Sequence, residues 1–520
     1  MPRQVALAIA FATLLTRQAW AQCPDGTPPP CGPRRVPPSA NSVAVLYFEN
    51  QSRDTSDSYL ATGLTEAIIA KLGDIPRLTV KSRYLVRRYQ GDAAHANPSE
   101  IGRALGVTYL VTGSVQRAGN RLRVTAEMAR AATGDRAWGQ QYERGDGDVF
   151  AIQEDIARGV ATGVAGRLLP TEAATIAARP TRNNQAYDHI LRGDVLLAQR
   201  TPPAVLRAVH EYEAAIGLDP TLVTGWARIG LTDAIRLDWD WGDGRPVADS
   251  VLQRGVAAAD RALALDSLSS DGWLARGYLL SFKNARTWEG AEAGIRRAIA
   301  LNPRNAEALH QLGDLLILRR YGDPDSTRRA GLTTQARESY LAALEAEPGR
   351  QVTMGNLSAY VPLAQRALLV DSAIALDPSY FFLYNNLANA RRAQRDTAGT
   401  RAALAMLQQK APEGALLYAR ALRASGTLTN GDTAEARGMV DALIQDLAPT
   451  GPITSRIGAP LISALNRLGD RARALDILER LPRGVFTWGR VRLDLITPDQ
   501  LAADPRMRRL VEENRPPWAR

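Results

Sequence analysis

The side chains able to do chemistry are scattered along this 520-residue chain. The four histidines are far apart, and the pair His210-Glu211 lacks the second histidine of a zinc-binding helix. The GxSxG elbow and the GxGxxG and GxxxxGK[ST] phosphate loops are absent from the sequence. These spacings favour a non-enzymatic protein with no catalytic residue, no cofactor and no metal site. The histidines that this interpretation covers are His95, His189, His210 and His310.

Carboxylate pairs are the one catalytic pattern that the sequence leaves open. Glu211 and Glu213 could in principle supply an acid and a base, as the paired carboxylates of a glycosidase do. Both lie on an expected helix surface, where solvent exposure is the simpler interpretation. Nothing in the sequence singles out one such pair.

The only two cysteines, Cys23 and Cys31, lie close together in a proline-rich segment at 22–42. In an oxidising compartment they could close a small disulfide loop, and the Pro-Asp-Gly turn between them would help. Two free thiols are the alternative. No histidine lies nearby, so a metal site is disfavoured. We expect a disulfide followed by a linker.

Residues 1–21 have the pattern of a signal peptide. A basic start at Arg3 is followed by a short apolar run and by Ala19-Trp20-Ala21, which fits an A-x-A cleavage site. The run is shorter than the roughly 20 apolar residues that span a bilayer. We expect export to the periplasm with cleavage after Ala21, and an uncleaved membrane anchor is the alternative.

The net charge of +10 does not indicate a nucleic-acid partner. The basic residues are interspersed with acidic ones, whereas a surface that tracks phosphates needs them gathered on one face. All but four of them are arginines. This skew is typical of a GC-rich genome, and we expect no nucleic-acid binding.

Residues 43–170 are expected to form a small α/β sandwich. Val43–Phe48 is a short apolar run typical of a buried strand, and the next segment repeats apolar residues every four positions, as an amphipathic helix does. Glycine-containing turns then separate three further strands, over 107–116, 121–129 and 137–144, before a helix over 150–169.

This first unit contains the segments YLATGLTE, GSVQRAGNRLRVT and ATGDRAW. With these segments, a stretch of some 125 residues resembles the TolB amino-terminal-like domain, which is related to FlgO and CsgG. The resemblance implies a bacterial domain that precedes tetratricopeptide repeats. Such domains follow winged-helix regulators, nucleotide cyclases or membrane-anchored kinases, or stand alone behind a signal peptide. No catalytic residue comes with it. Tyr47 departs from the family, which more often has proline there.

Residues 183–490 carry a repeat that predicts a tetratricopeptide-like helical solenoid. An alanine-rich helix end leads to a turn, a large side chain follows six residues later, and a glycine or alanine follows four residues after that. The turns end at Pro220, Ser267, Pro303, Pro348 and Pro378; the large side chains are Trp226, Trp273, Leu309, Met354 and Tyr384; the small residues are Gly230, Gly277, Gly313 and Ala388. Pro482 and Trp488 repeat the offset.

The turn spacings exceed the ideal period of about 34 residues in places. The extra length is expected in loops, at 238–246 and at 319–334. The first loop contains Trp239 and Trp241, which fall off the repeat pattern and are the candidates for an exposed protein contact. Trp226, Trp273 and Tyr384 are interpreted as packing residues. Residues 491–520 are expected to form a C-terminal cap and tail.

The predicted fold class is therefore α+β: a small α/β sandwich followed by an all-α solenoid. Stacked repeats leave a concave groove suited to a partner's segment, so the predicted function is a periplasmic protein-binding scaffold, with association with the cell envelope left open. A ligand sensor, with the α/β unit as receptor and the repeats as output, is the alternative. A third hypothesis is a regulator derived from a cyclase or kinase that lost its output module.

Overall fold

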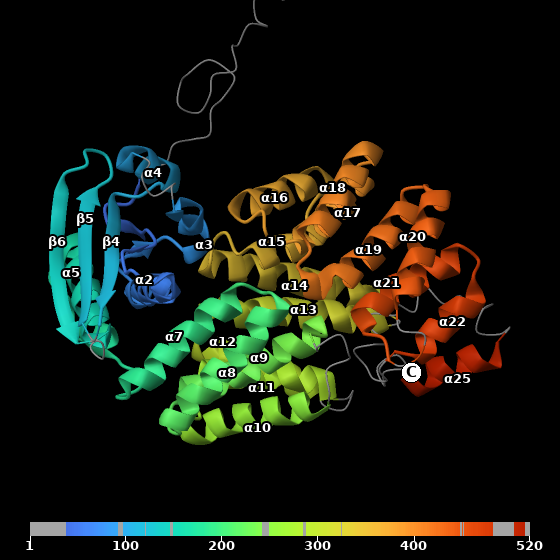
Figure 1. Cartoon of the computed structure of the whole chain (residues 1–520), viewed down its shortest axis with the longest axis horizontal. Coiled ribbons are helices and arrows are strands. Elements are labelled where there is room, and N and C mark those ends of the chain that lie inside the picture. Colours follow the sequence, from blue (N-terminus) through green and yellow to red (C-terminus); the bar gives the residue numbers. More distant parts are fainter. Residues whose placement is uncertain are drawn as a thin grey trace, which may run out of the picture.

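The computed structural model shows an α/β unit at one end of a curved stack of helices, so the protein is α+β (Figure 1). The expected signal peptide, both cysteines and His95 lie outside the residues that the structure describes. The described residues are 38–91, 97–119, 121–145, 149–241, 249–283, 288–323, 325–447, 450, 452–481 and 504–514.

The sheet has the strand order β3-β1-β4-β5-β6, with β2 also paired to β4. β1 runs parallel to β3 and β4, whereas β4, β5 and β6 form an antiparallel meander. The meander confirms the three strands expected from alternation and turn chemistry. The bounds are β1 Ser42–Val45, β2 Glu49–Asn50, β3 Thr79–Val80, β4 Tyr109–Ala118, β5 Arg121–Arg130 and β6 Arg136–Gly145.

Helices cover both faces of this sheet. On one face α2 (Ser58–Gly73) and α5 (Val149–Ala165) pack their apolar sides against alternate residues of β1, β4 and β5. Gly159 of α5 lies so close to β6 that an added Cβ would be 2.4 Å from the Trp138 ring. On the other face α3 (Arg83–Val86) and α4 (Pro98–Leu105) contribute to a second core with β1 and β4.

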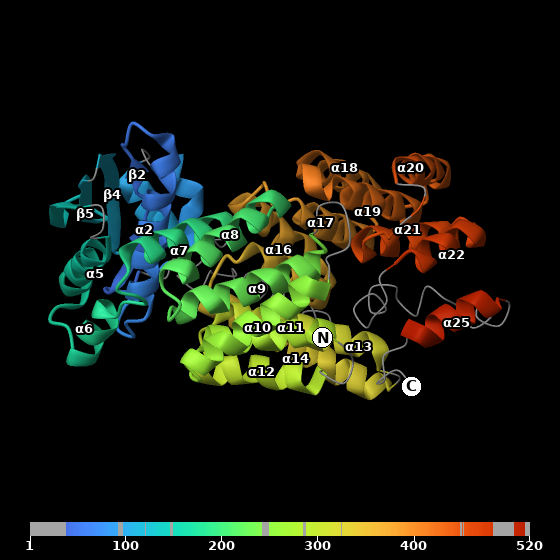
Figure 2. The same ribbon diagram turned by 60° about the horizontal axis from the view of Figure 1, so that its bottom comes forward.

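The remaining helices stack as antiparallel pairs in a tetratricopeptide-like solenoid (Figure 2). The pairs are α7 Asn184–Ala198 and α8 Pro202–Leu218; α9 Val223–Trp239 and α10 Asp249–Leu265; α11 Ser270–Lys283 and α12 Trp288–Leu301; α13 Ala306–Gly322 and α14 Ser326–Ala346; α15 Gln351–Leu357 and α16 Leu363–Leu376; α17 Phe382–Ala393 and α18 Thr397–Lys410; α19 Leu416–Thr429 and α20 Thr433–Asp446; α21 Ser455–Arg467 and α22 Arg471–Glu479. Short α6 (Pro170–Ala177) precedes them, and α25 (Pro505–Asn514) follows.

The six-residue offset in the sequence has a hydrogen bond as its physical cause. The Trp226 indole donates to the Pro220 carbonyl at 3.0 Å, and the Trp273 indole donates to the Ser267 carbonyl at 2.9 Å. The Tyr384 hydroxyl donates to the carbonyl six residues earlier in the same way, at 3.1 Å. Each large side chain thus fastens the start of its helix to the preceding turn, which confirms these three as packing residues.

The small residue of the repeat lets the paired helices approach. At Gly313 an added Cβ would lie 2.5 Å from the Tyr340 ring of α14. At Gly277 it would lie 2.8 Å from backbone atoms of α12, which cannot move aside. Any larger side chain here would force the two helices of the pair apart.

One loop expectation is wrong. Residues 319–334 were expected to connect two helices, but α13 continues to Gly322 and α14 begins at Ser326. The extra length of this repeat lengthens its helices instead. The Asp325 side chain accepts hydrogen bonds from Thr327 and Arg328 backbone N–H groups, so it starts α14 early.

Beyond the repeats, α25 lies within 491–520, where a cap was expected, and the other residues of that segment fall outside the described ranges, as do Pro482 and Trp488. Among the described helices, none combines the length and the apolar character that crossing a membrane requires.

Candidate functional site

The concave side of the solenoid encloses a cavity of about 840 Å³. Its lining comes mainly from the first helix of successive pairs: α9, α11, α13, α15, α17, α19 and α21. The repeat pattern positions these helices because the same turn bond and the same close approach recur along the stack. The cavity is therefore a product of the whole array.

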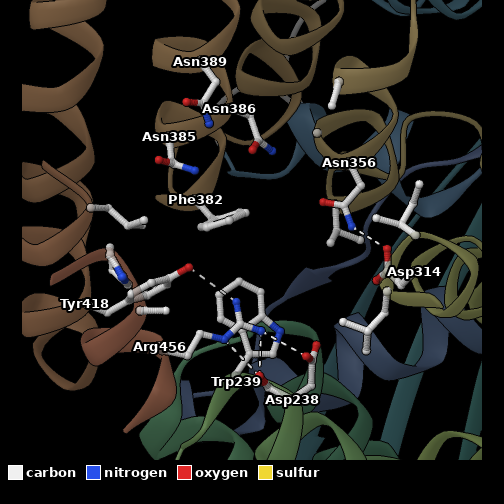
Figure 3. A pocket seen from close by; sticks show the side chains of 18 of the residues that line it. Asp238, Trp239, Asp314, Asn356, Phe382, Asn385, Asn386, Asn389, Tyr418 and Arg456 are labelled. Atoms are coloured by element: carbon white, nitrogen blue, oxygen red, sulfur yellow. Dashed lines mark hydrogen bonds and ion pairs between the residues drawn. The ribbon is translucent and has the colours of Figure 1, made fainter. Parts of the chain in front are cut away.

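Contacts between α9 and α21 bring distant parts of the array together across the cavity (Figure 3). The Arg456 guanidinium donates to the Asp238 carbonyl at 2.7 Å and to the carboxylate of the same residue at 3.1 Å. The Ser455 backbone N–H donates to the Asp240 carboxylate at 2.9 Å. These residues are more than 200 positions apart in the chain, so the superhelix closes on itself at this point.

An aromatic cluster lies beside this closure. Trp239 packs against Phe382 with ring centroids 5.5 Å apart and contacts Tyr380 and Phe381 at 6.4 Å. Arg456 lies over the Trp239 ring at 4.3 Å and over the Tyr418 ring at 5.6 Å. The cation–π contacts add to its bonds with Asp238, so Arg456 is held rigidly.

On the α13–α15 side, the charged groups are bonded within the protein. Asp314 accepts hydrogen bonds from the Tyr340 hydroxyl at 2.6 Å and the Asn356 amide at 2.9 Å, and His310 Nε2 lies 3.2 Å from it. Burial would raise the pKa of Asp314, but His310 and these bonds outweigh burial and hold the pKa below its usual value.

Glu307 is the second carboxylate of that wall. It pairs with Arg200 at 3.2 Å and with Arg350, and it accepts a hydrogen bond from the Gln311 amide at 3.0 Å. Burial raises the pKa of Glu307, yet the charges of Arg350 and Arg200 hold it well below its usual range. Glu307 is therefore charged and paired at neutral pH.

The same network reaches the α/β unit. Arg350, whose side chain is 2% exposed, also donates to the Tyr84 hydroxyl of α3 at 3.2 Å and pairs with Glu347 at 3.1 Å. Arg83, next to Tyr84, pairs with Glu66 of α2 at 3.2 Å. A chain of charged contacts thus joins the sheet domain to the wall of the cavity.

The α17 side differs. Asn385, Asn386 and Asn389 project from one helix into the cavity, across from Asn356 (Figure 3). No described residue forms a hydrogen bond with the side-chain amide of Asn385 or Asn386. A carboxamide offers N–H donors and a carbonyl acceptor, which can pair with the C=O and the N–H of a peptide bond, so it can bind an extended main chain.

The two tryptophans predicted as exposed contacts lie here, but not as expected. Trp241 is only 6% exposed and stacks on Trp239 at 5.2 Å, so its predicted exposure is wrong. Trp239 is partly buried and lines the cavity. The cause is helix α9, which extends to Trp239 and ends at Asp240 in the left-handed conformation, with φ 56°. A role of Trp239 in protein contact stays a prediction.

The described histidines and the Glu211/Glu213 pair are not assembled into one site. His189 Nδ1 lies 2.7 Å from Glu211, and Glu213 pairs with Arg254 at 3.0 Å. His310 is buried at the cavity wall. Within the described ranges, no three histidine, cysteine or acidic side chains form a group able to hold a metal ion.

The residues of the α17 wall were missed by the sequence reasoning. A signal was present, because the run Phe381 to Arg392 places three asparagines in a helix, where asparagine is unfavourable. Asn385 and Asn389 are four residues apart, which places them on one face. Polar residues repeated on the inner face of a predicted repeat helix would have indicated the cavity.

Fold and site together define a tetratricopeptide-like solenoid protein with a central cavity and an α/β domain docked at one end. No family model matches the chain. The protein named "Putative adenylate cyclase 3" of Rhizobium meliloti is 31% identical over 238 residues, which are 45% of this chain and 39% of the cyclase. The match thus spans about two fifths of that protein.

Two solved structures show a partial likeness in fold. Yeast Tom70 is 13% identical, with a TM-score of 0.37 over 71% of this chain and 82% of its own. A tetratricopeptide repeat protein from Parabacteroides merdae is 15% identical, with a TM-score of 0.31 over 52% of this chain and 95% of its own. The solenoid assignment itself rests on the repeat geometry described above.

Proposed function

We propose that this chain is a non-enzymatic interaction protein of the periplasm and that its cavity binds an extended segment of a partner protein. The observation that carries the proposal is the α17 wall, where Asn385 and Asn386 present carboxamides that bond to no described residue to a cavity of about 840 Å³. Such amides would pair with a partner's main chain, while the neighbouring Phe382 and Tyr418 rings would contact its apolar side chains.

The binding half of this proposal is tested by selecting random peptides on the immobilised protein and measuring the affinity of those enriched. The variant Asn385→Ala/Asn386→Ala removes the carboxamides and is expected to weaken binding by about tenfold. Asn184→Ala is the matched control, because this exposed asparagine lies outside the cavity. Equal affinity of both variants and the wild type would contradict the cavity as the binding site.

The proposed periplasmic location rests on the signal-peptide pattern at 1–21 and is tested separately. Expression of the full chain in a Gram-negative host, followed by N-terminal sequencing of the periplasmic fraction, is expected to find Gln22 as the first residue. A mature protein that retains Met1 would contradict cleavage. The expected Cys23–Cys31 disulfide is checked in the same sample by its mass before and after reduction and alkylation.

A sensor is the second candidate, favoured by the contacts that run from α3 through Arg350 to Glu307. In this scheme a ligand in one domain changes the other through these ion pairs. Hydrogen exchange of α3 with and without a selected peptide tests it. Altered protection of α3 on peptide binding would support coupling, and unchanged protection would count against it.

We propose no cyclase activity for this chain, since the match to the named cyclase covers 39% of that protein. The TolB-like resemblance of the first domain fits docking to an envelope assembly instead. Incubation of the purified protein with ATP and Mg²⁺ is expected to yield no cyclic AMP.

A further inference from the structure

The acidic side chains that line the cavity are all bonded within the protein. Asp314 accepts hydrogen bonds from Tyr340 and Asn356, and Glu307 pairs with two arginines. Asp238 pairs with Arg456 and accepts a hydrogen bond from the Tyr278 hydroxyl at 2.9 Å.

The cations of the same cavity fall into two groups. Arg200 and Arg456 each pair with one of these carboxylates. Arg392 and Arg467 do not: Arg392 donates only to the Asn389 side-chain oxygen, at 2.8 Å, and Arg467 donates only to the Thr429 hydroxyl. No described carboxylate pairs with either guanidinium.

Both arginines lie in the last turn of their helices, α17 and α21, where the helix dipole favours a positive charge. Repulsion between the positive charges of the two arginines opposes this favourable interaction with the helix dipole. Burial lowers the pKa of Arg392, and the positive charge of Arg467 lowers it further. Arg392 is half-buried and Arg467 is exposed, and the two guanidinium-bearing side chains line the same cavity from different helices.

We propose that Arg392 and Arg467 form a carboxylate-binding subsite and that the bound partner segment is an extended peptide bearing an aspartate or glutamate side chain. The inference rests on the proposed function, because it names the chemistry of the segment that the cavity holds. A guanidinium pairs well with a carboxylate through two parallel hydrogen bonds.

The neighbouring side chains supply the remaining contacts of such a segment. Asn385 and Asn386, about two helical turns before Arg392, face its main chain. Ser425 and Ser463 also line the cavity and add neutral hydroxyl groups. An acidic residue of the peptide therefore pairs with the two arginines, while adjacent residues contact the asparagine amides and the aromatic rings.

The experiment uses peptides selected on the full chain and resynthesised with amidated C-termini, so that every carboxylate belongs to a side chain. Each peptide is paired with a copy in which aspartate and glutamate are replaced by asparagine and glutamine. Affinities are measured by fluorescence anisotropy for the wild type, Arg392→Gln/Arg467→Gln, Arg392→Lys/Arg467→Lys and, as a control, the exposed Arg337→Gln.

The neutral copies are expected to bind the wild type and the control at least tenfold more weakly than the acidic peptides. On the glutamine variant the two copies should differ by less than twofold, and the lysine variant should keep part of the preference because it keeps the charge. Raising the salt concentration should weaken only the acidic peptides.

Failure of the inference is distinguishable from failure of the proposed function. If no peptide is enriched, both are overturned. If peptides bind but show no acidic preference, or keep it on the glutamine variant, only the carboxylate subsite is overturned. If the arginines serve the helix ends alone, the glutamine variant will have a lower melting temperature and an unchanged acidic preference.

Discussion

The two walls of the cavity are built from the same kind of helix but use their polar residues differently. On the α13–α15 wall, Glu307, Asp314 and Asn356 are bonded within the protein. On the α17 wall, Asn385 and Asn386 have no bond to described residues. Buried charges are costly unless paired, so the first wall must hold itself together. The second wall leaves the carboxamides of Asn385 and Asn386 available for hydrogen bonds.

Polar residues in one cavity thus serve two purposes. Bonded groups stabilise the array and attach the α/β domain, whereas unbonded groups are retained at some cost to stability, as at binding sites. Substitutions in the first wall should therefore lower the free energy of unfolding, and substitutions in the second should alter binding alone.

The largest effect is expected for Arg350→Ala. It removes one of the two arginines that pair with Glu307 and one of the two arginines that contact Tyr84 and Glu347. The free energy of unfolding should therefore fall by about 3–5 kcal/mol. Urea denaturation followed by circular dichroism measures it. Arg337→Ala, at an exposed position of α14, should change it by less than about 0.5 kcal/mol. A similar decrease in the free energy of unfolding for both variants would contradict the role of the bonded groups of the α13–α15 wall in stability.

Acid should weaken the same wall to a smaller extent. The folded-state pKa values of Glu307 and Asp314 are below their usual values, so the stability that they contribute is present above the ordinary carboxyl pKa of about 4. It is lost as the pH falls below that value. Urea midpoints measured between neutral and acidic pH should decrease, and Glu307→Gln should make the decrease shallower. If the pH dependence of the urea midpoint is unchanged in that variant, Glu307 does not contribute to the loss of stability in acid.

The contact between α9 and α21 is expected to make the next largest contribution to the free energy of unfolding. Arg456→Ala removes the bonds to Asp238 and the stacking on Trp239 and is expected to cost about 2 kcal/mol. Hydrogen exchange should show faster exchange at the C-terminal end of α9 while the sheet domain stays protected. If exchange there is unchanged, the α9–α21 contact does not hold the cavity closed.

The smallest stability effect is expected on the second wall. Asn385→Ala/Asn386→Ala removes groups that have no described partner, so the free energy of unfolding should change by less than about 0.5 kcal/mol. Thermal unfolding measures this, with Asn356→Ala as the matched comparison, because that side chain donates to Asp314 and its loss should cost about 1 kcal/mol. If Asn385→Ala/Asn386→Ala and Asn356→Ala lower the free energy of unfolding equally, the proposed difference between the two walls is wrong.

Local patterns sufficed for most elements of the fold. Asn97 caps α4 through its side chain and Gly106 ends it in the left-handed conformation, both adjacent in sequence to the helix they bound. The site could not be found in this way. Arg456 and Asp238 meet only because the repeats curve until α21 reaches the C-terminal end of α9. The spacing of the two residues in the sequence does not indicate this contact.

By itself the sequence determined the α+β class, the strand meander and the repeating helix pairs, because hydrogen bonds such as that from Trp226 to Pro220 join residues only six positions apart. Only the tertiary structure decided that Trp241 is buried and that α21 returns to α9. Small rotations between successive helix pairs add up along the stack. Their sum sets which side chains share the cavity, and no local pattern records that sum.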